Sequence, residues 1–240
     1  MFWWRRGEPG VDLGFTSREG GVSVGPYAGL NLGGRVGDDP EAVAANRARV
    51  AAAYGVDRDR LLFMAQCHGA DVLVVDGPYA GPEPSADAIV TTVPDLALGA
   101  LVADCTPILL WDADGPAVGA AHCGRPGLLA GIVPAVVVAL RDLGARDLRA
   151  VVGPSVCPRC YEVPPVMREE VATAAPASWS VSRTGTPALD VAAGAVEQLS
   201  AAGVVVADWV AGCTRESAGL YSFRGEGTTG RFAGVVVSRS

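Results

Sequence analysis

Short apolar runs bounded by Pro, Asp and Gly alternate along this chain with longer segments rich in helix-forming residues. Two of these runs, residues 101–111 (LVADCTPILLW) and 116–121 (PAVGAA), are apolar rather than alternating. Such short runs are typical of strands that are buried on both faces. Further strands are expected at residues 61–66, 71–77, 86–92, 148–156, 204–212, 219–223 and 232–238, and the first two of these are expected to pair.

Four segments have the composition of helices. A helix is expected to open at Asp39-Pro40, run through the Ala-rich residues that follow, and close at Gly55. Residues 127–144 should also be helical, and Pro134 either kinks that helix or marks its true start. Two more helices are expected at residues 163–176 and 189–203. The pattern predicts an α/β fold with mixed sheets, and no repeat or linker divides residues 1–240 into more than one domain.

Composition narrows the class of protein. With 240 residues, half of them hydrophobic, the chain can bury a full core and is not expected to be disordered. It carries 26 acidic and 19 basic residues, for a net charge of -7, and no basic run suggests a nucleic-acid or membrane partner. The N-terminus lacks the order of a signal peptide, and no apolar stretch reaches membrane-spanning length, so a cytoplasmic protein is expected.

The two histidines of the chain occupy comparable settings. His68 and His122 each lie near a cysteine at the end of an apolar strand. A lone histidine is usually a hydrogen-bonded structural residue, but here both histidines of the chain share this setting, which favours a role as ligands. Cys105, on the 101–111 run, completes a set of one Cys and two His, which is typical of an open zinc site with a vacant fourth position.

The same residues also suit a second chemistry. Without a metal, Cys105 and a nearby His would resemble a thiol nucleophile and its base, and the adjacent Asp104 is a further reactive candidate. The sequence does not separate these two interpretations, because both need the same side chains.

Four arginines are candidate anion-binding residues: Arg47, Arg125, Arg224 and Arg231. Arg47 and its neighbour Asn46 lie on the predicted Ala-rich helix, where a solvated face is the ordinary interpretation. Arg224 and Arg231 share one turn-bearing segment, which a surface hairpin would explain equally well. Neither a Walker A sequence nor a strand–GxGxxG–helix unit is present, so the usual nucleotide-binding folds are disfavoured.

Six cysteines in a chain without an export signal favour thiols or metal ligands over disulfides. Cys157 and Cys160 form a single C-x-x-C, which is weak support for structural zinc without a second pair, so thiols in a turn are the preferred interpretation. Cys213 is a candidate for the core or for the surroundings of the metal. Cys67 is expected to face away from His68, since neighbours on a strand alternate.

Seven segments, in order, resemble the YfiH-like family, whose members have been called multicopper polyphenol oxidases (laccase domain) and peptidoglycan editing factors. They are FTSREGGVSVGPYAGLNLGGRVGDDPEAVAANR, AQCHGADV, SADAIVTT, ADCTPILL, AAHCGRPG, GPSVCPRCYEV and CTRESAGLYSFRGEGTTGR. The resemblance implies a four-layer α/β/β/α fold with mixed sheets, and it implies that His68, Cys105 and His122 bind zinc. It further implies phosphorolysis of purine nucleosides (adenosine, inosine, methylthioadenosine), with adenosine deamination as a second activity.

The resemblance leads to a hypothesis for the reaction. Zinc would act as a Lewis acid or through water in deamination. In phosphorolysis the arginines would position phosphate for attack on the ribose anomeric carbon, with Arg47 first among them and Asp104 assisting proton transfer. The expected partners are a small nucleoside and phosphate, for a monomer or homodimer.

One segment departs from the family pattern. The family's H-A-G-W-R-G is His122-Cys-Gly-Arg-Pro-Gly here, so that Arg125 replaces Trp and Pro126 replaces Arg. The metal site is therefore expected to be intact and the substrate pocket altered, with Arg125 substituting for the missing Arg or with weakened activity.

Three other functions compete with the phosphorylase. A multicopper laccase needs many imidazoles, which two histidines cannot supply, so copper is less expected than zinc. An amidase that edits cell-wall precursors, and a silent metal-binding protein, remain as alternatives.

Overall fold

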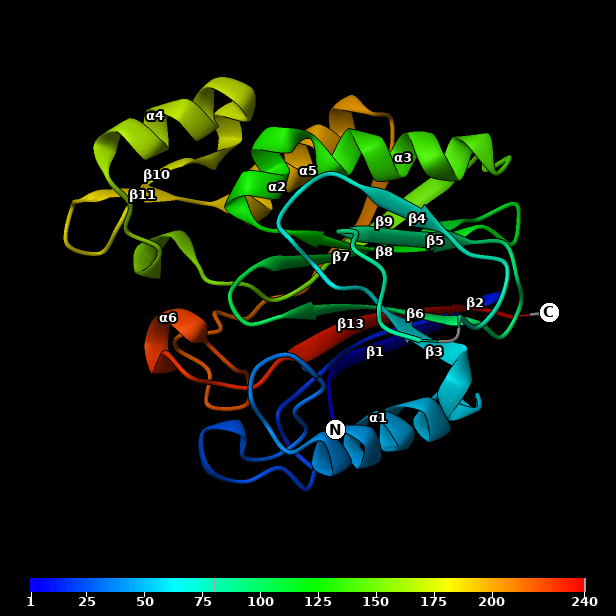
Figure 1. Cartoon of the computed structure of the whole chain (residues 1–240). Coiled ribbons are helices and arrows are strands. Elements are labelled where there is room, and N and C mark those ends of the chain that lie inside the picture. The colour runs from blue at the N-terminus through cyan, green and yellow to red at the C-terminus, as the bar shows by residue number, and fades with distance from the viewer. Residues whose placement is uncertain (80, 240) are drawn as a thin grey trace.

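Two β-sheets lie face to face in the computed structural model, which describes residues 1–79 and 81–239 (Figure 1). Helix α1 (Pro40–Ala53) covers the outer face of one sheet. Helices α2 (Arg125–Ala130), α3 (Ile132–Asp142) and α5 (Val191–Ala201) cover the outer face of the other. The layers follow the order α/β/β/α, which confirms the fold that the family resemblance implies.

The sheet beneath α1 has five strands and mixed directions. Its order is β1–β2–β13–β6–β3, antiparallel except for the parallel β6–β3 pair. The strands are β1 (Phe2–Glu8), β2 (Val11–Thr16), β13 (Phe232–Ser238), β6 (Ala97–Val102) and β3 (Leu61–Phe63).

The second sheet has six strands in the order β12–β9–β7–β8–β5–β4. Its two outermost pairs are parallel and its inner pairs antiparallel. The strands are β12 (Val205–Trp209), β9 (Leu148–Val152), β7 (Thr106–Asp112), β8 (Val118–Cys123), β5 (Ala88–Thr91) and β4 (Val72–Val74). Strands β7 and β8 are buried along their whole length, because the facing sheet covers one side and helices cover the other.

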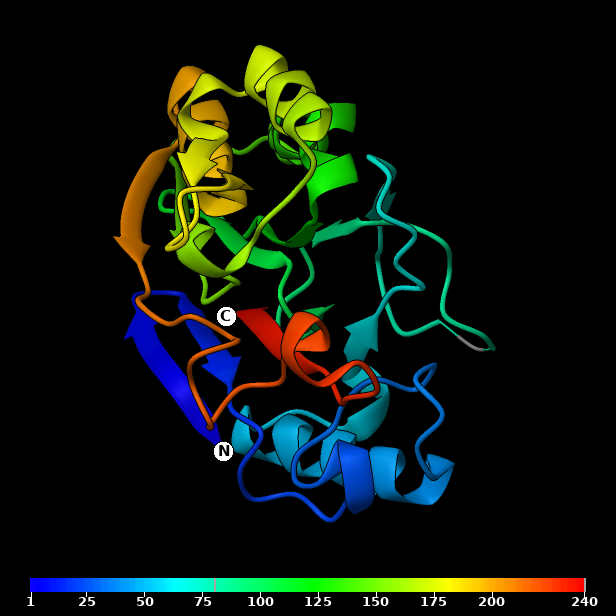
Figure 2. The same cartoon turned by 90° about the vertical axis from the view of Figure 1, so that its left-hand side faces the viewer.

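Smaller elements extend from this frame. Helix α4 (Pro165–Ala174) lies beside the two-stranded sheet of β10 (Trp179–Val181) and β11 (Pro187–Leu189). Helix α6 (Phe223–Glu226) lies near one end of the two large sheets, as both views show (Figures 1 and 2). In the described part of the chain, no helix is both long and apolar enough to span a bilayer.

Three apolar layers hold the four structural layers together. Between the two sheets pack residues such as Phe15, Leu98 and Leu109. The helices α2, α3 and α5 pack on the six-stranded sheet through a second cluster, and α1 packs on the five-stranded sheet around Tyr54 and Phe63. Each sheet is therefore apolar on both faces, as the uniformly apolar strands predicted.

Several local predictions are confirmed. The Asp39 side chain accepts a hydrogen bond from the Glu41 N–H and caps α1, with Pro40 as the first helical residue. Gly55, just beyond the helix, has a φ of 65°. Pro134 marks a helix start rather than a kink, because the chain turns at Gly131 (φ 84°) and α3 begins at Ile132.

Three predictions about strands are wrong. Residues 101–111 form parts of two strands in different sheets, β6 and β7, which a turn at Asp104 (φ 101°) connects. The expected pair at 61–66 and 71–77 is also divided, since β3 and β4 belong to different sheets. Residues 219–223 are no strand but lead into α6, so the segment carrying Arg224 and Arg231 is not a hairpin.

The solvated-face interpretation of α1 is also wrong. Asn46 and Arg47 are both buried. The Asn46 amide donates to the carbonyls of Gly29 and Asn31, and so holds the N-terminal loop against the helix. A polar residue in an Ala-rich helix can point inward when the carbonyl groups of an adjoining loop have no strand partner and accept hydrogen bonds from its side chain.

The contact between the sheets leads to a stability prediction. A Cβ atom on Gly153 would lie 2.4 Å from the Phe15 ring, which is itself fully buried. We expect Gly153→Ala to lower the free energy of unfolding by about 1–3 kcal/mol through overpacking. Urea unfolding measures this, with Gly7→Ala as the control, because a Cβ on Gly7 meets nothing within 4 Å. Equal stability of the two variants would contradict the packing described.

Candidate functional site

Three chain segments bring His68, Cys105 and His122 together at one end of the sheets. Cys105 lies in the connection from β6 to β7, just before β7 begins. Pro107 on β7 pairs with His122 on β8, which places the start of one strand beside the end of the other. His68 lies in the loop between β3 and β4, with a φ of 64°. The three predicted metal ligands therefore converge, although the chain separates them widely.

Asp87 organises two of the three side chains. Its carboxylate has no exposed surface and accepts hydrogen bonds from the backbone N–H groups of Cys67 (3.2 Å), His68 (2.9 Å) and Gly69 (2.7 Å). It also contacts His122 Nδ1 at 2.8 Å, so Nδ1 carries the proton and Nε2 is available to a ligand. Burial alone would raise the pKa of Asp87, but hydrogen bonds from His122, Cys67 and Gly69 outweigh it and hold that pKa well below its usual range.

The turn around Asp87 also changes the expectation for Cys67. Residues 67–69 wrap around the carboxylate rather than continue a strand, so the alternation rule does not apply to them. The Cys67 thiol donates to Asp87 Oδ2 at 3.1 Å.

The distances within the triad suit one metal ion. Cys105 Sγ lies 3.7 Å from His68 Nε2, and one ligand atom from each residue falls within 4.8 Å of the others. Tetrahedral zinc with the usual bond lengths places neighbouring N and S ligands ~3.5 Å apart. A Cβ on Gly124 would come within 2.7 Å of the His68 ring and 3.1 Å of Cys105 Sγ. The glycine after Cys123 thus leaves room for the triad.

Electrostatics at the triad favour a thiolate. Burial raises the pKa of Cys105, but the charges and hydrogen bonds of His122 and His68 outweigh burial and lower that pKa to about 6. Burial likewise lowers the pKa of His122, whereas the Cys105 thiolate and Asp87 raise it to about 9. One thiolate and two imidazoles fit zinc by chemistry as well as by distance. With two histidines in the chain, the imidazoles needed for a multicopper centre are not available.

A cavity of about 460 Å³ opens beside the triad. Its volume lies within the range of small-molecule sites. Apolar and aromatic side chains line it together with three arginines, one glutamate and Asp104. The arginines lie beside the aromatic rings, because Arg224 is 4.8 Å from the centre of the Tyr161 ring and Arg231 is 5.9 Å from that of Phe223. The lining includes Met64, Leu101, Val102, Tyr161 and Phe223 among the apolar and aromatic residues, and Arg35, Arg224, Arg231 and Glu83 among the charged ones.

Two of the predicted arginines line this cavity. Arg224 donates to the Glu162 carbonyl at 3.1 Å, and its guanidinium lies 4.8 Å from the centre of the Tyr161 ring. Arg231 donates through Nη1 to the carbonyls of Thr229 and Gly230, and burial lowers its pKa. Both side chains are held in place and present charge to the cavity.

The other two predicted arginines lie outside the lining. Arg47 donates to the Leu32 carbonyl at 2.8 Å and to Glu83 at 2.7 Å. Its Nη2 atom is buried without a hydrogen-bond partner among residues 1–79 and 81–239, and it lies directly behind Gly34 in the cavity wall. Arg125 begins α2 and interacts with Tyr161, whose pKa burial raises.

The departure at residues 122–127 is compatible with the local fold. Pro126 is the second residue of α2, and α2 follows β8 directly after Gly124. Proline at the start of a helix removes a donor that has no intrahelical acceptor, so it does not weaken α2.

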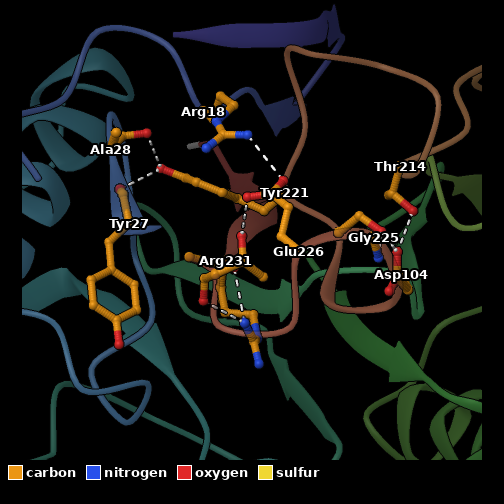
Figure 3. A network of polar contacts seen from close by, with 12 residues as sticks. Arg18, Tyr27, Ala28, Asp104, Thr214, Tyr221, Gly225, Glu226 and Arg231 are labelled. Atoms are coloured by element: carbon orange, nitrogen blue, oxygen red, sulfur yellow. Dashed lines mark hydrogen bonds and ion pairs between the residues drawn. The ribbon is translucent and has the colours of Figure 1, made fainter. Parts of the chain in front are cut away.

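Asp104 connects the triad to the C-terminal segment. Its Oδ1 atom accepts from Thr214 (2.6 Å) and Ser222 (2.7 Å), and its Oδ2 accepts from the Arg224 N–H (2.6 Å). Figure 3 shows the Thr214 contact within a larger network. In that network Tyr221 donates to two carbonyls of the N-terminal loop. The carboxylate is thus engaged on both oxygens.

Several residues of the site were missed in the sequence. Asp87 lies in an apolar segment, ADAIV, and only its position inside a strand pattern marks it as unusual. Gln66 lines the cavity while its amide bonds to both the N–H and the carbonyl of Leu101. Arg35, Tyr161 and Phe223 carry no local signal, because their role depends on loops that only the fold brings together.

Known proteins that resemble this chain come from one family. The sequence model described as Multi-copper polyphenol oxidoreductase laccase matches residues 12–239. A purine nucleoside phosphorylase of Streptomyces coelicolor is 54% identical over 230 residues, which cover 95% of each chain. The purine nucleoside phosphorylase YfiH of Escherichia coli K12 is 36% identical over 231 residues, covering 95% of this chain and 93% of that protein.

A solved structure agrees with these sequences. The crystal structure of YlmD from Geobacillus stearothermophilus has a TM-score of 0.89 and 31% identity to this chain, and covers 100% of this chain and 97% of its own. Since the sequence match and the structural match both extend over nearly all of its length, the chain belongs to the YfiH family of laccase-domain proteins.

Proposed function

We propose that this protein is a zinc-dependent purine nucleoside phosphorylase that takes a small nucleoside and phosphate as substrates. The observation that carries the proposal is the triad of His68, Cys105 and His122 beside a cavity that both aromatic side chains and arginines line. Relatives at 54% and 36% identity bear the name purine nucleoside phosphorylase, which supports the same activity. We expect it to act in the cytoplasm, as a monomer or homodimer.

Zinc bound by the triad would supply a Lewis acid at the edge of the cavity. The chain prepares the site for it. Asp87 holds a proton on His122 Nδ1, so Nε2 is the nitrogen that would bind the metal as its own proton leaves, and the lowered pKa of Cys105 provides a thiolate ligand. Because both groups are already oriented, little reorganisation accompanies binding of the metal.

The apolar and aromatic side chains of the lining suit a purine ring. Met64, Tyr161 and Phe223 offer flat or flexible apolar surface, and Arg224 stacks near Tyr161 to keep that ring in place. Glu83 and the backbone of Gly33 and Gly34 lie in the same lining, where the hydroxyl groups of ribose need partners.

The arginines of the lining suit phosphate. Arg224, Arg231 and Arg35 place positive charge at the cavity, and Arg47, which lies outside the lining, adds a buried positive charge near Gly34. In phosphorolysis an oxygen of phosphate bonds to C1′ of the ribose while the bond from C1′ to the purine nitrogen breaks. The electron pair leaves with the purine, which takes up a proton. The arginines would hold the phosphate in line for this attack.

We assign Asp104 a positioning role in this reaction. Its two oxygens already accept three hydrogen bonds, from Thr214, Ser222 and the Arg224 backbone. It would thus keep the arginine-bearing segment next to Cys105 rather than exchange protons with substrate.

An assay with and without phosphate tests the proposed function. The metal-loaded protein is incubated with adenosine, inosine and methylthioadenosine, and the released base, sugar phosphate and ammonia are measured. We expect free base together with the matching sugar 1-phosphate (ribose 1-phosphate, or methylthioribose 1-phosphate from methylthioadenosine), in amounts that depend on phosphate. Ammonia without phosphate would point to a deaminase, and no turnover of any nucleoside would refute the proposal.

Removing one cavity arginine should weaken phosphate binding in particular. We expect Arg231→Ala to raise the KM for phosphate by about 10–100-fold, because charge-assisted hydrogen bonds contribute about 1.5–3 kcal/mol each. The KM for nucleoside should change much less. Steady-state kinetics with varied phosphate measure this, with exposed Arg146→Ala as the control. An unchanged phosphate KM would remove Arg231 from the phosphate site.

A further inference from the structure

A second cluster of metal-ligating side chains lies outside the cavity. We propose that Cys157, Cys160, Cys213 and Glu216 bind a structural zinc ion, as a closed site distinct from the open triad. One ligand atom from each of these residues lies within 4.8 Å of the others. The proposal does not rest on the enzymatic activity, because none of the four residues lines the cavity beside the triad in the described part of the chain.

The spacing along the chain supports this site. Cys157 and Cys160 form a C-x-x-C, and Cys213 and Glu216 form a C-x-x-E, so the second ligand pair that the sequence seemed to lack comes from a distant segment. A β-bridge between Ser155 and Cys213 joins the two segments. Structural zinc sites commonly take closely spaced ligand pairs from two chain segments. Three of the four ligands here are cysteines, and the fourth is a carboxylate, which zinc also accepts.

Both ligand pairs lie on tight turns. In the first turn the Cys160 N–H donates to the Cys157 carbonyl at 2.9 Å. In the second the Glu216 N–H donates to the Cys213 carbonyl at 3.1 Å. The Cys157 N–H also approaches Cys213 Sγ at 3.4 Å, and so stabilises a thiolate there. Cys160 is buried and Cys157 and Cys213 are half-buried, so the sulfur atoms are largely removed from solvent.

Charge around the cluster offsets the charge of its ligands. Arg183 Nη2 lies 3.2 Å from Cys160 Sγ and also pairs with Glu216, and Arg159 lies 3.3 Å from the same carboxylate. Three thiolates and a carboxylate around a divalent ion leave two negative charges, which these two guanidinium groups balance. The arginines also hold Glu216 beside the thiols, with Oε2 at 3.9 Å from Cys157 Sγ.

The position of the site indicates what it would stabilise. The first turn leads directly to Tyr161 in the cavity lining, and the second carries Thr214, which donates to Asp104 beside the triad. A zinc ion here would tie together two loops that follow β9 and β12 and would hold this wall of the cavity. We therefore assign it a structural rather than a catalytic role.

Cobalt binding tests the site without altering it. In the variant His68→Ala/Cys105→Ser/His122→Ala the triad is removed and the cluster is intact. We expect it to bind about one equivalent of Co²⁺, with the near-ultraviolet thiolate-to-cobalt band and the strong visible bands of tetrahedral sulfur ligation. Adding Cys157→Ser and Cys213→Ser should abolish these bands, whereas adding Cys67→Ser should not, since Cys67 lies outside the cluster.

Thiol labelling of the wild-type protein gives an independent measurement. Iodoacetamide labelling followed by peptide mass spectrometry should find Cys157, Cys160 and Cys213 protected with zinc and labelled after a chelator. Exposed Cys67 should be labelled in both cases. Absence of the cobalt bands in the triad-free variant, or an intact mass showing a disulfide within the cluster, would overturn the proposal.

Discussion

The His122→Ala variant is expected to lose zinc from the triad and, with it, phosphorolysis of every nucleoside. Its imidazole is the most buried of the three ligands, and removing it leaves His68 and Cys105 as an incomplete site. The change also takes from buried Asp87 the partner at 2.8 Å that balances its charge. Because a Lewis acid supplies several kcal/mol of transition-state stabilisation, we expect kcat/KM to fall by at least about 100-fold.

Two measurements on one preparation check this result. The zinc content, measured by mass spectrometry of the digested protein, should fall by the amount that the triad binds, while the cysteine cluster keeps its own ion. Cys123→Ala is the matched control: this neighbouring thiol packs into the apolar layer beneath the helices, so it should cost about 1–2 kcal/mol of stability and leave metal and turnover intact. Full activity of His122→Ala would show that the triad is not the reaction centre.

The Asp87→Asn variant is expected to weaken zinc binding about 10–100-fold although it touches no metal ligand atom directly. Each carboxylate oxygen accepts at least two N–H donors, His68 and His122 on one and Cys67 and Gly69 on the other. An amide has one acceptor oxygen, so the side chain of the variant places its NH₂ group against two donors in either orientation. The His68 turn and the His122 ring then lose the contacts that orient them.

Competition with a chromogenic chelator measures this loss of affinity. The control is Asp190→Asn, which alters another partly buried carboxylate that accepts a backbone N–H, at the start of α5 and remote from the triad. Asparagine is a good N-cap, so this variant should keep wild-type affinity. Equal affinity of both variants would mean that the Asp87 carboxylate does not orient the ligands.

The sequence predicted the triad because its residue types are rare in this chain. The two histidines stood at the ends of apolar strands and Cys105 on the 101–111 run, and the pairing of β7 with β8 brings Cys105 and His122 together. The helix from Asp39-Pro40 to Gly55 was also predictable, because the residues that begin and end it are next to it in the sequence.

The sequence did not reveal how one apolar run divides between two sheets. The chain turns at Asp104 with a positive φ, and the aspartate itself is the one local signal of that turn, because no Gly stands beside it in residues 101–111. The reason is tertiary: hydrogen bonds from Thr214, Ser222 and Arg224 hold that turn, and all three come from the end of the chain.

Burial of Arg47 and the role of Asp87 were hidden for a related reason. Each is a charged side chain whose partners lie on distant segments, Glu83 and Leu32 for Arg47, and His122 for Asp87. Periodicity reports which residues are apolar but not which charges are compensated. The second pair of the cysteine cluster escaped notice in the same way, because Cys213 and Glu216 lie far from Cys157.

Anomalous diffraction at the zinc edge, from crystals of the purified protein grown with zinc, tests the central claim most directly. The account predicts a peak within bonding distance of His68 Nε2, Cys105 Sγ and His122 Nε2, facing the cavity. A fully active enzyme with no zinc peak among these three atoms would contradict it.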